Sequence, residues 1–269
     1  MNLLLSRVIS AIVGALILIF VIFLGGWVFK IALMLVALVG LFEFYSVVQR
    51  GKIKLINLVG FISAVLIFIA TDFNMRDSIF FILLITIIFL FMVSIFSKKY
   101  GFNDIMITML GLVYPTLSFI TILLISKVAF PINNLALILL FLLTWSSDTF
   151  AYFSGKLLGK HKLSPDLSPK KTIEGAVGGV IGPIAIGMIC WAVGNFYFNF
   201  SIDWYHFLVI GLICGIFSQF GDLSASFIKR NYDAKDFGYI MPGHGGILDR
   251  FDSVLFTAPL TYIYFTLVL

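Results

Sequence analysis

The chain has 269 residues, of which 61% are hydrophobic and only 12% charged, and its formal net charge is +5. Soluble domains carry about a quarter charged residues, so this composition excludes an ordinary soluble globular protein. Repeated apolar runs of about 20 residues predict helices that cross a bilayer. We therefore expect an all-α polytopic integral membrane protein.

Nine apolar runs follow one another along the chain, and each is a candidate membrane span. They fall at 4–24, 27–48, 55–71, 78–97, 105–126, 135–154, 173–198, 205–228 and 251–269. A cleaved signal peptide is the alternative for the first run, because Arg7 precedes an apolar stretch. No small-residue cleavage site follows before Trp27, so we expect a retained first helix. The runs predict one integral-membrane domain over 1–269, with 1–134 mainly structural and 135–269 carrying a polar site.

The basic residues are distributed unevenly between the connections. Fifteen of the 18 lysines and arginines lie near the N-terminus or in the loops that follow even-numbered runs. Only Lys30, Arg76 and Lys127 belong to the opposite side. The positive-inside bias therefore predicts a cytoplasmic N-terminus and cytoplasmic even loops. The net positive charge is a topology signal, and we expect no nucleic-acid partner.

A first polar cluster starts inside the sixth run. Asp148, Tyr152 and Gly155 follow one another at helical spacing and share one face, so Asp148 is expected to point into the bundle near its cytoplasmic mouth. In the loop that follows, Lys156 and Lys160 suit a substrate phosphate and an anionic lipid headgroup equally well.

The seventh run is preceded by Lys170, Lys171 and Thr172. A helix N-terminus favours anions, phosphate above all, because its first N–H groups have no partner within the helix. We therefore expect these two lysines to bind phosphate.

Small residues at a spacing of four recur in the seventh and eighth runs. The pairs are Gly175/Gly179, Gly178/Gly182 and Gly211/Gly215. Such pairs let membrane helices pack closely, so we expect the sixth to eighth spans to surround one polar cavity. The same spacing permits a homodimer.

A second polar cluster joins the eighth and ninth runs. Asp222, Ser226 and the Lys229–Arg230 pair form one helical stripe, and Asp249 and Asp252 begin the ninth run. With Asp148 they make four acids at one predicted membrane face. An all-oxygen acidic site beside basic residues suits Mg²⁺ holding a polyphosphate, whereas zinc would need more His or Cys ligands. The alternative is that the acids only pair with neighbouring bases.

The residues of this second cluster carry a resemblance. The segment 226–252, SFIKRNYDAKDFGYIMPGHGGILDRFD, resembles the signature of the phosphatidate cytidylyltransferases, also called CDP-diacylglycerol synthases. The stretch 159–175, GKHKLSPDLSPKKTIEG, resembles the second region of that family. Met241 stands where Leu, Ile or Phe is expected, which is a mild apolar change.

The resemblance implies that CTP reacts with phosphatidic acid, held among membrane lipids, to give CDP-diacylglycerol and pyrophosphate. It implies Mg²⁺ as the cofactor and leaves a second cation open. Asp222 and Asp249 would bind the cation, with Asp148 and Asp252 as additional ligands. The implied catalytic residues are Asp148, Asp222, Lys229, Arg230, His244, Asp249, Arg250 and Asp252. The implied substrate-binding residues are Lys160, Lys170, Lys171, Thr172, Ser226, Lys235, Gly245 and Gly246.

Two other functions stay open at this point. One is a CTP-dependent enzyme that acts on another membrane lipid, such as a polyprenol kinase or a CDP-archaeol synthase. The other is an ion-coupled transporter, in which polar residues would be distributed across the depth of the bilayer. Here they gather at one predicted membrane face, which disfavours transport.

Overall fold

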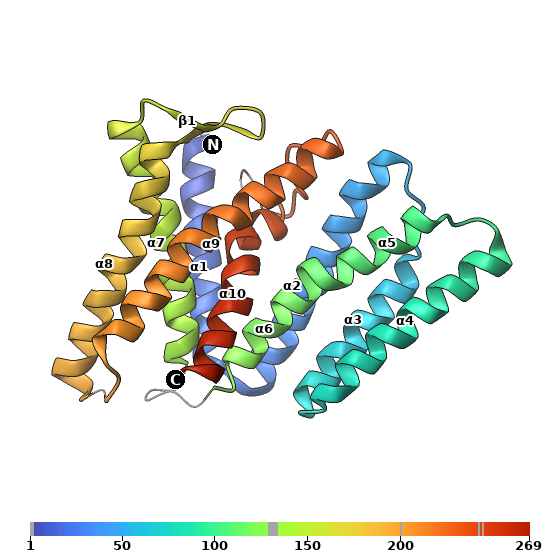
Figure 1. Cartoon of the computed structure of the whole chain (residues 1–269), viewed down its shortest axis with the longest axis horizontal. Helices are drawn as coiled ribbons and strands as arrows, with labels where there is room; N and C mark the ends of the chain where they lie inside the picture. Colours follow the sequence, from blue (N-terminus) through green and yellow to red (C-terminus); the bar gives the residue numbers. More distant parts are fainter. Residues whose placement is uncertain (1–2, 129–133, 200, 242, 244) are drawn as a thin grey trace. The chain divides into compact units, whose positions relative to one another are not determined.

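The computed structural model is almost entirely helical and describes residues 3–128, 134–199, 201–241, 243 and 245–269 (Figure 1). The all-α class is therefore confirmed. The contacts divide the chain into two compact units. Unit 1 comprises Met1–Leu124 and Lys229–Arg250, and unit 2 comprises Ile125–Ile228 and Phe251–Leu269. The single domain expected from the sequence stays a prediction.

Unit 1 is built from a series of apolar helices joined by short turns. They are α1 (Leu3–Leu24), α2 (Gly26–Val48), the 3₁₀ turn η1 (Gln49–Gly51), α3 (Asn57–Asp72), α4 (Arg76–Ser97), α5 (Phe102–Gly111), η2 (Leu112–Thr116) and α6 (Leu117–Ile125). The π-turn η2 joins α5 to α6 without a break and contains Pro115. Proline has no N–H for the α-helical ladder, which accounts for the change of helix type there.

The core of unit 1 is apolar, with a few paired polar groups. Ile56, Leu90 and Ile105 form one buried cluster. The ring of Tyr45 is fully buried, and its hydroxyl donates to the Thr108 carbonyl oxygen at 2.8 Å. The cluster joins the turn before α3 to α4 and α5, and the Tyr45 hydrogen bond joins α2 to α5.

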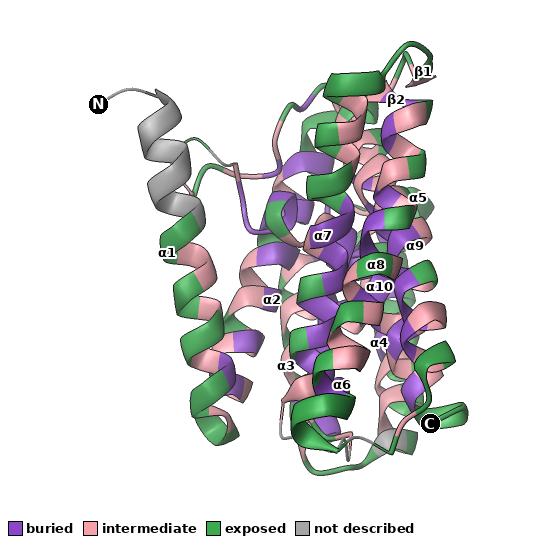
Figure 2. Ribbon diagram, turned by 90° about the vertical axis from the view of Figure 1, so that its left-hand side faces the viewer, coloured by how far each residue is buried: buried purple, intermediate pink, exposed green. Residues whose placement is uncertain are grey.

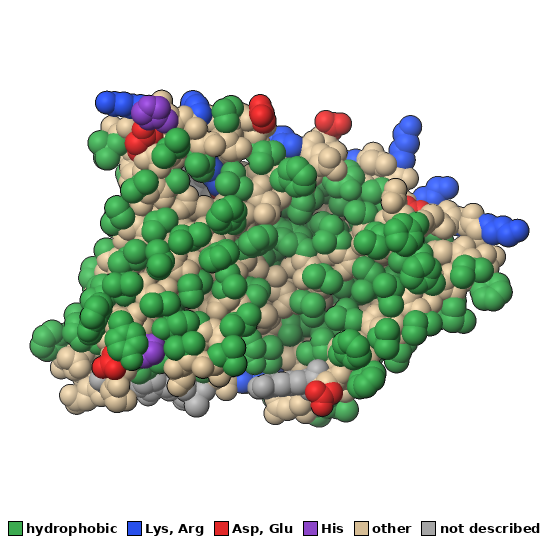
Figure 3. All heavy atoms as spheres, viewed as in Figure 1, with side chains coloured by type: hydrophobic (Ala, Val, Ile, Leu, Met, Phe, Trp, Pro, Cys, Tyr) green, Lys and Arg blue, Asp and Glu red, His purple; other side chains and the backbone are tan. Residues whose placement is uncertain are grey.

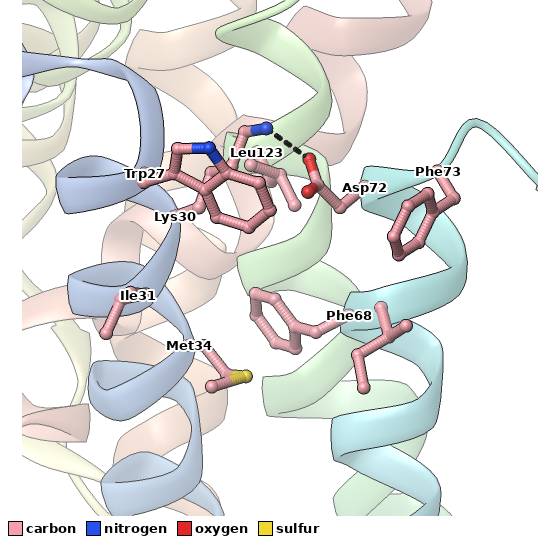
Figure 4. A pocket seen from close by; sticks show the side chains of 9 residues that line it. Trp27, Lys30, Ile31, Met34, Phe68, Asp72, Phe73 and Leu123 are labelled. Atoms are coloured by element: carbon pink, nitrogen blue, oxygen red, sulfur yellow. Dashed lines mark ion pairs between the residues drawn. The ribbon is translucent and has the colours of Figure 1, made fainter.

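An ion pair lies at the beginning of α2 and the end of α3. Lys30 Nζ is 2.6 Å from Asp72 Oδ1 and 4.7 Å from the centre of the Trp27 ring. Figure 4 shows this pair above Phe68, where it borders an apolar cavity of about 140 Å³. The pair connects the two helices at this end of the unit.

Unit 2 combines long helices with one small hairpin. Its elements are α7 (Leu135–Leu158), β1 (Lys162–Ser164), β2 (Ser168–Thr172), α8 (Ile173–Phe198), α9 (Trp204–Asn231) and α10 (Leu248–Leu267). The last turn of α9 and the first turn of α10 belong to unit 1. The strands are antiparallel, with Lys162 opposite Thr172 and Ser164 opposite Ser168. This hairpin was not expected from the sequence. Figure 2 shows buried residues along α7 and exposed residues on the hairpin.

The close packing expected from the glycine pairs is confirmed in unit 2. A Cβ atom at Gly175 in α8 would lie 2.9 Å from the Ala151 carbonyl oxygen in α7. A Cβ atom at Gly211 in α9 would lie 2.7 Å from the Pro183 carbonyl oxygen in α8. Only glycine allows these backbones to approach so closely. Because the pairs are used within the chain, the homodimer stays a prediction.

The membrane character of the chain follows from its helices. Six of the described helical segments are long and apolar enough to cross a bilayer: Gly26–Gly51, Asp77–Ser97, Phe102–Ile125, Leu135–Leu158, Ile173–Phe198 and Trp204–Asn231. Large apolar side chains are exposed on them, such as Phe96 at 82% and Phe196 at 78%. Figure 3 shows hydrophobic side chains covering most of the visible helix sides, as expected for a surface in contact with lipid. Nine crossings and a cytoplasmic N-terminus stay predictions.

Candidate active site

A polar pocket of about 370 Å³ opens in unit 2. Its lining comes from α7, the hairpin, the start of α8 and the C-terminal half of α9. The lining residues are Asp148, Ala151, Tyr152, Gly155, Lys156, Leu163, Lys170, Lys171, Thr172, Gly175, Gln219 and Asp222. Asp148, Tyr152 and Gly155 all lie on it, so the helical face predicted from their spacing is confirmed.

Two carboxylates share this pocket, one from α7 and one from α9. Asp222 Oδ2 is 2.6 Å from Lys171 Nζ, and the two side chains are 34% and 25% exposed. Asp148 Oδ1 accepts a hydrogen bond of 3.4 Å from Ser253 Oγ. Next to Asp222, Gly221 brings α9 close to α10, because a Cβ atom there would lie 2.5 Å from the Asp252 carbonyl oxygen. Both carboxylates thus stand on helices that pack tightly and remain open to the pocket.

The hairpin places two of the pocket lysines, Lys170 and Lys171. Thr172 ends β2 and caps α8, since its hydroxyl accepts from the Gly175 N–H at 3.1 Å. Glu174, in the first turn of α8, accepts from the backbone N–H of Lys160 at 3.0 Å and contacts His161 Nδ1 at 2.7 Å. The two ends of the loop between α7 and α8 are thereby tied together, and Lys171 is fixed beside Asp222.

Some predicted residues belong to this pocket and others do not. Lys170, Lys171 and Thr172 line it, whereas Lys160 is absent from its lining. Asp252 lies in unit 2 outside the lining, and its Oδ1 accepts from the Ser253 N–H at 2.8 Å. Ser226 is partly buried on α9. Two of the four predicted acids, Asp148 and Asp222, therefore line this pocket together with the predicted Lys170 and Lys171.

One polar lining residue, Gln219, was missed, and Lys156 had been left open between a substrate phosphate and a lipid headgroup. Gln219 precedes Asp222 by three positions, and its Nε2 donates to the Ala176 and Gly215 carbonyl oxygens at 3.0 and 2.8 Å. The helical spacing to Asp222 was the available signal. Lys156 lies 5.8 Å from the centre of the Tyr152 ring and lines the pocket. Of the two lysines left open in this loop, Lys156 lines the pocket and Lys160 does not.

The donor set of the pocket fits a magnesium ion. Magnesium is usually held by one or two carboxylates together with water and substrate phosphates, and it needs no cage made only of protein. Asp148 and Asp222 supply two carboxylates. Within the described ranges, no group of three or more His, Cys, Asp or Glu side chains is arranged to hold a metal. The pocket therefore suits a cation that arrives together with a phosphate ligand.

The part Lys229–Arg250 of the signature segment lies in unit 1, and Asp249 is a buried acid near its end. Asp249 Oδ1 is 2.7 Å from Lys229 Nζ, and Oδ2 accepts from the backbone N–H groups of Phe237 and Gly246 at 2.8 and 3.0 Å. The residue is only 7% exposed. Its carboxylate therefore fixes three points of the segment.

The remaining signature residues are mostly exposed. Arg230 donates from Nη1 to the Ala234 carbonyl oxygen at 3.2 Å, and Lys235 and Arg250 lie at the surface of the unit. Gly245 has a φ of +79° and its carbonyl accepts from the Met241 N–H at 2.9 Å, which closes a tight turn. His244 lies outside the described residues. The predicted roles of these residues stay predictions.

The sequence is also similar to those of known proteins. A model of the cytidylyltransferase family matches residues 5–268. The chain belongs to this family. Phosphatidate cytidylyltransferases from Staphylococcus haemolyticus and Bacillus subtilis are each 34% identical, and the alignments cover 96% and 98% of this chain and 97% of each relative. One from Staphylococcus aureus is 46% identical over 123 residues, or 46% of each chain. The similarity thus extends well beyond the two polar clusters.

Proposed function

We propose that this protein transfers the cytidylyl group of CTP to phosphatidic acid, giving CDP-diacylglycerol and pyrophosphate. The family and the names of its nearly full-length relatives support this activity. The single structural observation that carries the proposal is the pocket of unit 2, in which two carboxylates and three lysines meet.

The chemistry needs this combination of charges. An oxygen of the lipid phosphate attacks the α-phosphorus of CTP, and the bond to the pyrophosphate leaving group breaks. Two polyanions must approach each other, so Lys156, Lys170 and Lys171 would offset their repulsion and hold phosphate oxygens. The nucleophile is already an anion, so no strong general base is required.

The carboxylates would hold magnesium. Asp148 and Asp222 would share the ion with phosphate oxygens, and bound magnesium would stabilise the charge that develops on the α-phosphoryl group and on pyrophosphate. Lys171 neutralises Asp222 before the ligands bind, since the two form the 2.6 Å pair. Asp249 was expected to bind the cation together with Asp222, and Asp252 to be an additional ligand like Asp148. These two roles, and a second cation, stay predictions.

The membrane setting supports the lipid substrate. Phosphatidic acid can keep its acyl chains in the bilayer while its phosphate enters a pocket at the end of the helices. We place the pocket on the cytoplasmic face, because the positive-inside bias puts the loop between α7 and α8 there and because CTP is cytoplasmic.

A labelling experiment separates this activity from the alternatives. Purified protein in detergent with phosphatidic acid is given CTP labelled in the α- or in the γ-phosphate. We expect the α-label alone to enter the lipid. Entry of the γ-label would indicate a lipid kinase. If the α-label entered another lipid but not phosphatidic acid, the proposed substrate would be contradicted.

A further inference from the structure

Glu43 is a buried acid on α2 that contacts the signature segment some 200 residues later in the chain. It is 2% exposed. Its Oε1 accepts from the Ile247 N–H and its Oε2 from the Leu248 N–H, each at 2.9 Å. All these residues belong to unit 1. Both carboxylate oxygens are therefore used to hold the backbone where the signature segment turns into α10.

The two N–H groups are those that a helix start leaves without a partner. Because α10 begins at Leu248, neither N–H reaches a carbonyl within the helix. A side chain near in sequence usually accepts such bonds. Here the acceptor comes from another helix, so formation of this helix start is coupled to the position of α2.

Two signature glycines leave the space that Glu43 occupies. A Cβ atom at Gly238 or at Gly246 would overlap the Glu43 carboxylate. The Gly246 N–H also donates to Asp249 at 3.0 Å. Glu43 and Asp249 thus hold the same short stretch of backbone: Asp249 accepts from the Gly246 N–H, and Glu43 accepts from the next two N–H groups.

Other contacts of α2 with the segment extend this arrangement. A Cβ atom at Gly40 would lie 3.1 Å from Leu248 Cδ2, and one at Gly51, just after α2, would lie 2.8 Å from the Tyr232 ring. α2 and the turn after it therefore contact the signature segment at two places, near Tyr232 and at Leu248. The N-terminal half of the chain, which was expected to be mainly structural, supports the signature directly.

We propose that Glu43 is a positioning residue for the transferase reaction: it holds residues 246–249 so that Asp249 and the adjacent signature residues are presented in one geometry. This inference rests on the proposed function for the role of the signature segment. Glutamine cannot replace Glu43, because its amide group would present N–H donors to one of the two backbone N–H groups. Aspartate keeps both acceptors but is one methylene shorter.

The test compares Glu43→Gln and Glu43→Asp with the matched control Ser46→Ala. Ser46 lies one turn further along α2, and its hydroxyl bonds only to the Phe42 carbonyl of its own helix among the hydrogen bonds described. Backbone hydrogen exchange, thermal unfolding and the kinetic constants for CTP are measured in detergent. We expect Glu43→Gln to lose exchange protection at Ile247 and Leu248 and to lower kcat/KM for CTP about a hundredfold, the size expected for a misplaced reacting group. The exchange protection and kcat/KM of Glu43→Asp should lie between those of Glu43→Gln and the wild type. Both quantities should be unchanged in Ser46→Ala.

The outcomes separate the two proposals. Normal exchange at Ile247 and Leu248 in Glu43→Gln, or a loss of rate that only follows the unfolded fraction, would overturn the role of Glu43. A wild-type protein that transfers no α-label from CTP would instead overturn the proposed function, whatever the exchange shows. If Glu43→Gln does not fold, Gly238→Ala tests the same contact, because its added methyl group should disturb exchange at 246–248 with Glu43 in place.

Discussion

Two acidic regions of this molecule use their carboxylates in opposite ways. In the pocket of unit 2, Asp222 is 34% exposed and forms an ion pair with Lys171. In the signature segment of unit 1, Asp249 is 7% exposed and accepts from Lys229 and from two backbone N–H groups. Glu43 is similarly occupied by two backbone N–H groups.

The difference teaches that acids of the same polar cluster in the sequence can have different primary tasks. A carboxylate that is open on one side can accept a cation or exchange its lysine partner for a ligand. A carboxylate that accepts from three donors mainly fixes the conformation of its own loop. Because its orientation is fixed, it can also act as a metal ligand in a defined position. Substitutions should therefore affect activity and stability in different proportions in the two regions.

The largest expected effect on turnover is that of Asp222→Asn. Loss of a carboxylate that would help to stabilise phosphoryl charge should lower kcat/KM about 10³-fold. The unfolding temperature should stay nearly constant, since a partly exposed ion pair contributes little stability. Transfer of α-labelled CTP and thermal unfolding measure both. Asp166→Asn is the control, because Asp166 is exposed on the hairpin outside the pocket lining; an equal loss in both variants would mean that the pocket is not the site.

Asp249→Asn should have its main effect on stability. Asparagine can still accept the two backbone N–H bonds, but its amide group would face Lys229, whose side chain is only 11% exposed. Leaving a buried charge without its partner should cost about 3 kcal/mol. Thermal unfolding and hydrogen exchange in 229–250 measure this, with Asp233→Asn at an exposed position as the control. An unchanged unfolding temperature would mean that Asp249, like Asp222, contributes little to stability, which would contradict the difference between the two acidic regions.

Lys171→Ala should have a smaller effect than Asp222→Asn and should act through CTP binding. A hydrogen bond to a charged group contributes about 1.5–3 kcal/mol, so KM for CTP should rise ten- to a hundredfold. Steady-state kinetics in CTP measure it. Lys162→Ala is the matched control, because Lys162 is exposed in β1 and absent from the pocket lining. The same change of KM in both variants would indicate general attraction of anions to the hairpin.

Gly178→Ala should have the smallest effect on turnover per folded molecule. Its methyl group would overlap the Ser154 side chain where α8 packs on α7. Overpacking of this kind costs about 1–3 kcal/mol of stability. Thermal unfolding measures the loss, and Gly14→Ala is the control, because nothing lies within 4 Å of a Cβ atom there. A large loss of kcat at full stability would show that this packing also shapes the pocket.

The sequence predicted the helices and part of the pocket for clear physical reasons. Apolar runs and the 3.6-residue period are local signals, so the helix bounds and the shared face of Asp148 and Tyr152 could be predicted. The glycine pairs are equally local. The β1–β2 hairpin lies in a short polar loop with no alternating pattern, and the π-turn at Pro115 depends on its neighbours.

The contact of Glu43 could not be predicted by local reasoning. It joins residues separated by 204 positions, and a single acid in an apolar helix shows no periodicity that names its partner. A substrate-binding role was predicted from the sequence for Gly246, and none for Gly238. The structure shows that both glycines leave room for the Glu43 side chain.

The most direct test of the account is a magnesium titration of cytidylyl transfer to phosphatidic acid by the wild-type protein and Asp222→Asn. If the pocket of unit 2 holds the cation with the phosphates of CTP, the variant should need at least about tenfold more Mg²⁺ for half its maximal rate, and that rate should stay far below the wild-type rate. An Asp222→Asn protein with wild-type turnover and an unchanged Mg²⁺ requirement would contradict the account.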